Sequence, residues 1–398
     1  MRTYEKTHPW ISFHLDPTRL PWSGWLLLGE AQSKCEHIAG VPLEPEVATK
    51  LHRIYLAKGV HATTAIEGNT LTEDDVLQQM DGKLEVPTSK KYLQQEIENI
   101  LAACNETVKA CIAEGPEHRL SPELLKDYDR KVLRGVPLPE HVAPGELRSY
   151  SIGVGRYRGA PPEDLAHLLD QLCTWLGRDE LNVGGDARLA FAIIRAVLAH
   201  LYLAWIHPFG DGNGRTARLA ELSILLCAGV PTPAAHLLSN HYNETRAEYY
   251  RQLEQASASG GDVVPFIRYA VQGFVDGLRK QLGEVREQQL EVAWRNYVYA
   301  QTKGRSAAHE RRRNLVLDLT GHGPADLGEL AGLSPRLAVA YARKTPKTLT
   351  RDLNALQTMG LIVKREQRWC ANADIIRAYL PLRLPSEKPT VVGDRQKT

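Results

Sequence analysis

The chain has 398 residues, of which 43% are hydrophobic and 24% charged, and its net charge is +2, so it can bury a large core and form more than one domain. No N-terminal leader is visible, and no uninterrupted apolar run approaches the roughly 20 residues of a membrane helix, so we expect a cytoplasmic protein without a membrane partner. The six cysteines are scattered and form no C-x-x-C pair, which argues against a disulfide framework and against zinc.

The N-terminal region, residues 1–57, has a run of three leucines before a polar helix, and we expect it to pack on the core. The next predicted helix covers about 58–68 and ends at Glu67, directly before Gly68, a residue type that commonly terminates helices. The negative end of the helix dipole disfavours a carboxylate at this position. The placement of Glu67 is therefore best explained if its carboxylate meets a cation from another part of the fold.

A small β-hairpin is predicted at residues 149–159. Apolar and aromatic residues alternate there with polar residues and glycines, and a period of two with glycines is typical of a hairpin. A plain surface hairpin would give the same pattern.

Two helices flank the next loop. From Asp186 onward, apolar residues spaced by four mark the buried face of the first helix: Leu189, Ile193, Val197 and Leu201. The second helix is predicted over 215–227, with Leu219, Leu222 and Leu226 inside, and ends before Gly229 and Pro231. The loop 208–214 therefore lies at a helix N-terminus, where unpaired N–H groups and the helix dipole favour anions.

The residues from His207 to Arg215 read H-P-F-G-D-G-N-G-R, and Arg218 follows three positions later. Glycines let backbone N–H groups approach an anion, arginines neutralise it, and the carboxylate of Asp211 can hold a hard divalent cation. Histidine has an ordinary pKa of about 6.5, so His207 is left for proton transfer. This combination is typical of a site for nucleotide phosphates.

These residues resemble the signature of the Fic family, H-P-F-x-(D/E)-G-N-(G/K)-R, at every position, and the resemblance extends over about 60–275. It implies an all-helical Fic core over 91–280 and transfer of AMP from ATP to a hydroxyl of a target protein. His207 would be the general base and Asp211 the Mg²⁺ ligand. A further segment, 243–253, is similar to the one that lines the adenine pocket in the family. The resemblance thus implies these nucleotide-binding residues: Gly210, Asp211, Gly212, Asn213, Gly214, Arg215, Arg218 and Tyr249.

The family resemblance also gives a role to the region 1–90. Thr63, Glu67 and Gly68 match the (S/T)-x-x-x-E-(G/N) pattern of the inhibitory helix of many Fic proteins. Glu67 would pair with Arg218 and occupy the space that the γ-phosphate of ATP needs, so the protein would be self-inhibited. The hairpin at 149–159 would be the flap that aligns a segment of the target protein by strand addition. Fic cores of this kind often form homodimers, and we expect one here.

The C-terminal part of the chain is basic, with 13 Lys and Arg and 6 Asp and Glu between Lys303 and Arg368, a net charge of +7. It follows a polar helix around 281–289, and Ser306 to Ala308 is the expected hinge. The predicted elements are helices at 314–319, 326–331 and 348–359, a turn at 333–335, and strands at 360–365 and 369–371. Three helices followed by a hairpin is the order of a winged helix-turn-helix domain, here 285–385, before a polar tail at 386–398.

The last helix and hairpin of this domain resemble those of winged-helix regulators. If DNA is bound, Thr350, Arg351 and Asn354 would enter the major groove, and Lys364 and Arg365 would reach phosphates. Many Fic proteins carry such a module for protein contact, and a basic excess is an electrostatic signal without sequence readout. A DNA partner and a protein partner both stay open.

The expected fold is therefore mainly α, an all-helical Fic core with a small hairpin flap and a C-terminal winged-helix domain. Protein adenylyl transfer is the leading function. A second hypothesis is a DNA-binding regulator whose nucleotide site only senses a ligand. A third is an enzyme of the same fold that transfers another phosphate-linked group, or removes AMP from a modified protein, as some self-inhibited Fic proteins do with the inhibitory glutamate positioning water.

Overall fold

The structure is a computed structural model, and it describes all residues except 42, 44, 116–117, 156 and 378–398. It divides into two compact units, Met1–Gly283 and Glu284–Thr398. The predicted polar tail at 386–398 and the last residues of the predicted winged-helix domain lie outside the described residues.

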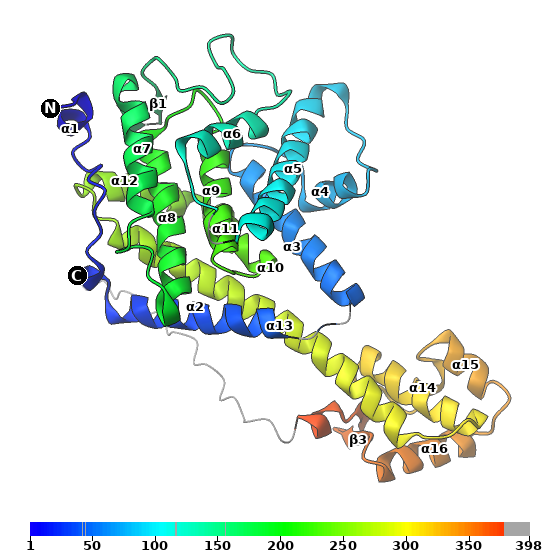
Figure 1. Cartoon of the computed structure of the whole chain (residues 1–398). Coiled ribbons are helices and arrows are strands. Elements are labelled where there is room, and N and C mark those ends of the chain that lie inside the picture. The colour runs from blue at the N-terminus through cyan, green and yellow to red at the C-terminus, as the bar shows by residue number, and fades with distance from the viewer. Residues whose placement is uncertain (42, 44, 116–117, 156, 378–398) are drawn as a thin grey trace, which may run out of the picture. The chain divides into compact units, whose positions relative to one another are not determined.

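The first unit is helical apart from one small hairpin (Figure 1). Its α-helices are α1 (Thr3–Thr7), α2 (Trp22–Gly40), α3 (Pro45–Ala65), α4 (Glu73–Met80), α5 (Lys91–Glu114), α6 (Pro122–Val132), α7 (Leu165–Leu176), α8 (Arg188–Ile206), α9 (Asn213–Cys227), α10 (Thr232–Ala235), α11 (Leu237–Glu244) and α12 (Arg246–Ala258). The next helix, α13 (Val264–Gln301), begins in this unit and continues into the second.

Helix α8 forms the centre of the first unit, beside α9 (Figure 1). Fifteen of its 19 residues are buried, because the helix is apolar on all sides and neighbours cover each side. The segment Gly185–Ile206 is long and apolar enough to cross a membrane by composition, and 83% of its most apolar window is buried inside the protein. Arg195 interrupts its apolar residues, in keeping with the expectation that no uninterrupted apolar run approaches membrane-helix length, and burial in the core explains the composition.

Helix α9 begins at Asn213, two residues earlier than predicted, and buries polar as well as apolar residues. It packs against α8, α5 and α6. Leu219 and Leu222 are buried as expected, whereas Leu226 is only partly buried near the C-terminal end. The loop before α9 is thereby held at the centre of the bundle.

Helix α3 is longer than the predicted helix 58–68 and ends earlier, at Ala65. Its N-terminal extension has no glycine or proline after Pro45, so nothing interrupts the helix before Gly59, which stays helical. The chain then turns, and Gly68 has a φ of +99°, which only glycine adopts readily. The N-terminal region packs on the core through Leu28 and other residues of α2, as expected.

The predicted hairpin is present as β1 (Gly153–Val154) and β2 (Tyr157–Arg158), which pair antiparallel. Its turn contains Gly155, with a φ of +58°. The hydroxyl of Tyr157 donates to the backbone oxygen of Trp205, 2.8 Å away, and so anchors the hairpin to the end of α8.

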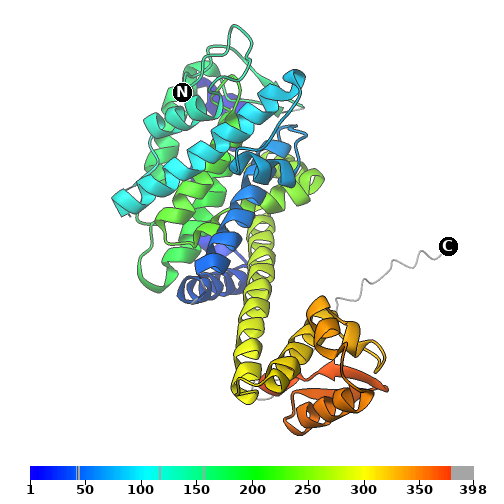
Figure 2. The same ribbon diagram turned by 90° about the vertical axis from the view of Figure 1, so that its right-hand side faces the viewer.

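The second unit contains the end of α13 followed by α14 (Ala307–His322), α15 (Pro335–Tyr341), α16 (Pro346–Thr358), β3 (Ile362–Arg365) and β4 (Arg368–Ala371). Figure 2 shows its helices in yellow to orange and its hairpin in orange-red. It has its own core of Leu315, Leu319, Leu353 and Leu356, among others. The winged-helix assignment stays a prediction, although helices followed by a hairpin are observed.

Two details of the second unit differ from the prediction. The segment 326–331 is mostly turn, with a three-residue 3₁₀ helix at Leu330–Gly332, and α15 was missed. The hydroxyl of Ser334 accepts a hydrogen bond from the backbone N–H of Leu337, and this cap starts α15 where a turn alone was expected. Ser306 likewise caps α14, so it begins a helix rather than forming a hinge.

Candidate functional site

His207 directly follows α8 and has a left-handed backbone, with φ 49° and ψ 62°. A non-glycine residue adopts this conformation only when its surroundings hold it there. The guanidinium of Arg148 supplies much of that support. It donates to the backbone oxygens of His207 at 2.7 Å, Tyr150 at 2.5 Å and Ala160 at 2.5 Å.

The same environment changes the chemistry of the imidazole. Burial and then the positive charge of Arg148 lower the pKa of His207 to about 4, although nearby Glu67 and Asp211 raise it. His207 is therefore neutral at pH 7 and can accept a proton. Arg148, which directly precedes the hairpin region 149–159, was not among the predicted site residues.

The loop after His207 is braced by its own residues. The side chain of Asn213 accepts from the backbone N–H of Phe209 at 2.9 Å and donates to the backbone oxygen of Phe209 at 2.8 Å. Both polar atoms of Asn213 are thus engaged in the loop, whereas the family resemblance implied a nucleotide-binding role for this residue. Gly212 has a φ of +75°, and a Cβ there would lie 2.7 Å from Oδ1 of Asp129. Gly210 is packed as closely, since a Cβ would lie 2.5 Å from the hydroxyl of Tyr150.

Glu67 approaches the N-terminus of α9. Gly212, the residue before α9, has no side chain to form a capping hydrogen bond, so no capping group competes with an anion for the first N–H groups of the helix. A Cβ at position 214 would overlap Oε1 of Glu67, so Gly214 permits the close approach. A carboxylate thus lies where a helix N-terminus favours an anion.

The carboxylate of Glu67 also pairs with Arg218, as predicted from the sequence. Nη2 of Arg218 lies 2.5 Å from Oε1 of Glu67 and 2.9 Å from the backbone oxygen of Thr63. Burial raises the pKa of Glu67, but Arg218, Arg215 and His207 outweigh it and leave this pKa below its ordinary value. The pair is therefore charged at neutral pH.

Arg218 keeps unused hydrogen-bonding capacity. Its Nε and Nη1 atoms are buried and have no hydrogen-bond partner, and the same holds for Nε of Arg215. Buried donors of this kind are costly when unpaired. An anion held between the two arginines would satisfy them.

Arg215 is fixed by two carboxylates. Its Nη1 lies 2.9 Å from Oε1 of Glu96, and its Nη2 lies 3.1 Å from Oδ1 of Asp211. The other oxygen of Glu96 accepts from the side chain of Asn69, one residue after Gly68. Glu96 thus links α9 to the turn that carries Glu67. It was not predicted, because it is one of several acids in α5 and no local pattern marks it.

Tyr249 lies in the core and not on an open surface. It is 4% exposed, its hydroxyl lies 2.8 Å from Nε2 of His200, and its ring stacks on Tyr242 at 4.9 Å. Burial raises its pKa well above the ordinary value. The neighbouring Tyr250 is 44% exposed, and its hydroxyl lies 3.4 Å from the backbone oxygen of Ile66. Tyr250 therefore offers an accessible ring, whereas the predicted base contact was Tyr249.

Asp211 is the residue of the loop whose carboxylate suits a magnesium ion. The side chain of Asp211 is 47% exposed and its Oδ1 already accepts from Gly212 and Arg215. A single carboxylate with phosphate oxygens and water is a common way for a protein to bind Mg²⁺. Asp211 would hold the ion, and the other loop residues would bind the phosphates.

The fold and the loop together define a helical protein in which a buried histidine and two arginines lie at a helix N-terminus. Residues 119–225 match the model of the Fic/DOC family. The chain is 30% identical to protein adenylyltransferase fic-1 of Caenorhabditis briggsae over 57% of its length, and 30% identical to protein adenylyltransferase Fic of Nematostella vectensis over 53%. Residues 119–225 of the chain therefore form a Fic domain.

Solved structures agree on the fold. A Fic family protein from Desulfovibrio desulfuricans aligns with a TM-score of 0.55 at 20% identity, covering 90% of this chain and 98% of that one. Fic-1 from Caenorhabditis elegans aligns with a TM-score of 0.53 at 23% identity, covering 66% of this chain and 73% of that one. This chain spans 41% of the C. briggsae protein and 45% of the N. vectensis protein, less than half of either curated relative.

Proposed function

We propose that the protein transfers AMP from ATP to a Ser, Thr or Tyr hydroxyl of a target protein and that Glu67 restrains this activity. The observation that carries the proposal is the contact of Glu67 with Arg218 at the N-terminus of α9, where unpaired arginine donors remain. A carboxylate that occupies an anion site is readily exchanged for phosphate. The names of the relatives, protein adenylyltransferases, support the same chemistry.

The reaction needs one proton acceptor and several fixed donors. Neutral His207 would take the proton of the acceptor hydroxyl, whose oxygen then bonds to the α-phosphorus of ATP. The bond from that phosphorus to the bridging oxygen breaks, and pyrophosphate leaves with the electron pair. Arg215 and the backbone N–H groups at the start of α9 would stabilise the negative charge on the phosphate oxygens. Mg²⁺ bound at Asp211 would supply further charge neutralisation.

Self-inhibition follows from competition for the same place. With Glu67 against Gly214 and Arg218, its negative charge opposes a phosphate at the end of α9. We further infer that the exposed hairpin β1–β2 aligns the target segment by main-chain pairing, since Val154 is 44% exposed and the strands are short.

A labelling experiment tests the proposal. The full chain and its Glu67→Gly and His207→Ala variants are incubated with α-labelled ATP, Mg²⁺ and a cell lysate. We expect Glu67→Gly to increase label on protein several-fold and His207→Ala to abolish it. Glu85→Gly is the matched control, because Glu85 is an exposed loop glutamate remote in sequence from the motif. Absence of label with every variant would refute the transfer, and equal label with and without Glu67 would refute the inhibition.

Protein labelled by the Glu67→Gly variant also serves as a substrate for the reverse direction. Release of free AMP by the wild-type protein, but not by Glu67→Gly, would assign removal of AMP to the chain instead. A persistent label would leave transfer as the sole direction.

A second candidate function belongs to the C-terminal unit, for which we propose DNA binding. Thr350, Arg351 and Asn354 are exposed on α16, and Lys364 and Arg365 are exposed at the tip of the β3–β4 hairpin. Basic side chains that contact phosphates release counterions, so affinity should fall steeply with salt. A titration with duplex DNA tests this, and no binding at low salt would reject DNA in favour of a protein partner.

A further inference from the structure

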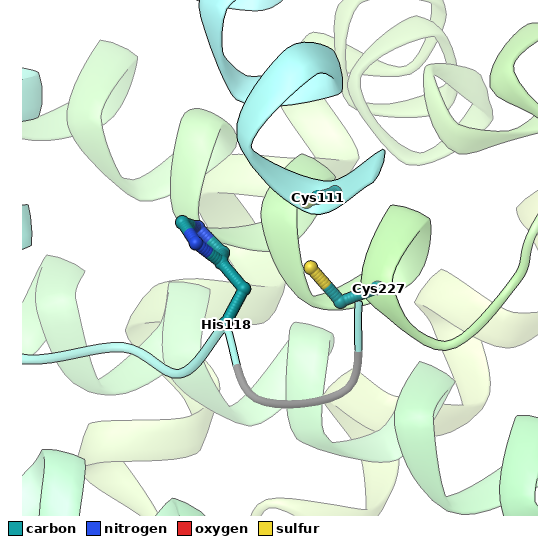
Figure 3. Close-up of side chains that lie close together, drawn as sticks. All are labelled: Cys111, His118 and Cys227. Carbon is teal, nitrogen blue, oxygen red and sulfur yellow. The ribbon is translucent and has the colours of Figure 1, made fainter. Parts of the chain in front are cut away.

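Three potential metal ligands meet at the end of the first unit that is remote from His207. Cys111 lies near the C-terminus of α5, Cys227 is the last residue of α9, and His118 follows α5 in the chain (Figure 3). Their ligand atoms all lie within 4.8 Å of one another. Since α9 rises about 1.5 Å per residue over its 15 residues, the cluster is roughly 20 Å from the phosphate loop.

The histidine of this cluster is oriented by a neighbouring carboxylate. Its Nδ1 atom lies 2.8 Å from Oε2 of Glu114, four residues earlier, and its side chain is 7% exposed. Its Nε2 atom is buried and has no hydrogen-bond partner. A carboxylate on one ring nitrogen, with the other nitrogen free, is the arrangement that prepares histidine to bind a metal ion.

The two cysteines complete a set of soft ligands. Neither forms a disulfide, and Cys111 is 7% exposed. Tetrahedral zinc with two sulfurs and one nitrogen requires ligand atoms about 3.5–3.8 Å apart, given the usual bond lengths. The limit of 4.8 Å exceeds this spacing by about 1 Å, a difference that rotation about the side-chain bonds can close.

A cavity of about 300 Å³ reaches the cluster and provides an entry path and space for water. It is lined by His118 and Cys227 and also by Arg119, Arg188 and Arg195. Two thiolates would offset the two charges of a divalent zinc ion, so the complex would add no net charge beside these arginines.

We propose that Cys111, His118 and Cys227 bind one zinc ion, with Glu114 positioning the histidine and water from the cavity as the fourth ligand. Binding releases the two thiol protons, and no oxidation is involved. The absence of a C-x-x-C pair hid the site in the sequence, because Cys111 and Cys227 are brought together only by the packing of α5 against α9.

The ion would join the two helices that hold the phosphate site. Helix α5 carries Glu96, which pairs with Arg215 at the other end of α9. A clamp between the C-terminal ends of both helices would limit their sliding. The role expected of the zinc ion is therefore structural.

Metal analysis of the reduced full-length protein tests the proposal. We expect about one zinc per chain by mass spectrometry, and the metal-stripped protein should bind Co²⁺ with the absorption bands of a cobalt–thiolate complex. His118→Ala and Cys227→Ser should lose these bands, and Glu114→Ala should weaken Co²⁺ binding about 10- to 100-fold. Cys173→Ser is the matched control, because Cys173 lines the same cavity outside the cluster. Circular dichroism of each variant checks that it is folded.

Several outcomes would overturn the zinc site. A folded, reduced protein that takes up neither zinc nor cobalt rejects it, and so does a cobalt spectrum that persists without Cys227. A mass lower by two hydrogens before reduction, with no metal uptake afterwards, would assign the thiols to a disulfide. None of these readouts uses adenylyl transfer, so the result is independent of the proposed function.

Discussion

Replacement of Glu67 by glycine should make the phosphate site accessible at a cost in stability. Among the described residues, Glu67 is the only one that forms an ion pair with Arg218. Without it, the guanidinium is a buried cation with unpaired donors. The variant should therefore be less stable when free and should gain more from binding nucleotide.

The exposure of Glu67 and Arg218 determines how much stability the Glu67→Gly substitution costs. The side chain of Arg218 is 1% exposed and that of Glu67 is 33% exposed. Removal of one member of a fully buried pair costs about 3–5 kcal/mol, whereas exposed pairs contribute about 0–1 kcal/mol. Because the pair is partly exposed, we expect Glu67→Gly to lower the free energy of unfolding by about 2 kcal/mol. Removal of the competing carboxylate would strengthen ATP binding by the same free energy, which corresponds to about 30-fold in affinity.

Thermal unfolding with and without ATP and Mg²⁺ measures both effects. The free Glu67→Gly protein should unfold at a lower temperature than wild type, and saturating nucleotide should raise its unfolding temperature more. Glu67→Gln retains the size of the side chain and lacks its charge, so it should follow the glycine variant in affinity with a smaller loss of stability.

The reasoning fails if the glycine and glutamine variants bind ATP no more tightly than wild type. It also fails if Glu85→Gly, which alters an exposed loop glutamate, gives the same gain. Loss of stability alone, without a gain in affinity, would make the contact with Arg218 structural.

Three further predictions concern groups around the loop. Burial raises the pKa of Asp129 from 3.8 to about 7, so stability from its protonated form is present below about pH 4 and lost as the pH rises to 7; Asp129→Asn, which cannot ionise, should unfold at a higher denaturant concentration than wild type at pH 8 but not at pH 4. The pKa of His207 is lowered to about 4, so stability from its neutral form is present above pH 6.5 and lost as the pH falls toward 4; His207→Ala should be less sensitive to acid over this range in denaturant titrations. Arg148→Lys retains a charge but not the three carbonyl contacts. Protein labelling by the double variant Arg148→Lys/Glu67→Gly should therefore be at least about tenfold lower than labelling by Glu67→Gly, with a smaller change in ATP affinity. Unchanged labelling would deny Arg148 a positioning role.

Local sequence rules predicted the parts of the molecule that depend on neighbouring residues. The helix before His207 shows an apolar period of four, and the loop after it needs glycines with their particular backbone. The hairpin at 149–159 and the outward face of α16 follow from alternation and helical spacing in the same way. These features need no knowledge of which elements pack together.

The missed contacts join residues that are distant in the chain. Arg148 reaches the backbone of His207 across 59 positions, and Glu96 reaches Arg215 across 119. Nothing near Arg148 or Glu96 in the sequence marks them, because arginine and glutamate are ordinary on solvent-exposed surfaces. The Glu67–Arg218 contact, at 151 positions, was predicted because the Fic resemblance implied it; the helix dipole indicated only that Glu67 meets a cation.

Burial of polar residues in α9 distinguishes them from Glu67, the proposed inhibitory residue. Asn213, Arg215, Arg218 and Glu221 are each less than 7% exposed, so their charges and hydrogen bonds must be satisfied inside the protein. Glu67 is the exception, since it is partly exposed and comes from a turn rather than from the packed helix. Under the proposed inhibition, the acid that opposes a phosphate can therefore leave without unpacking the core. A nucleotide, a target segment or a partner that displaces this turn would need to break the ion pair and two or three backbone contacts, whereas displacement of any charged group of α9 would require opening the bundle.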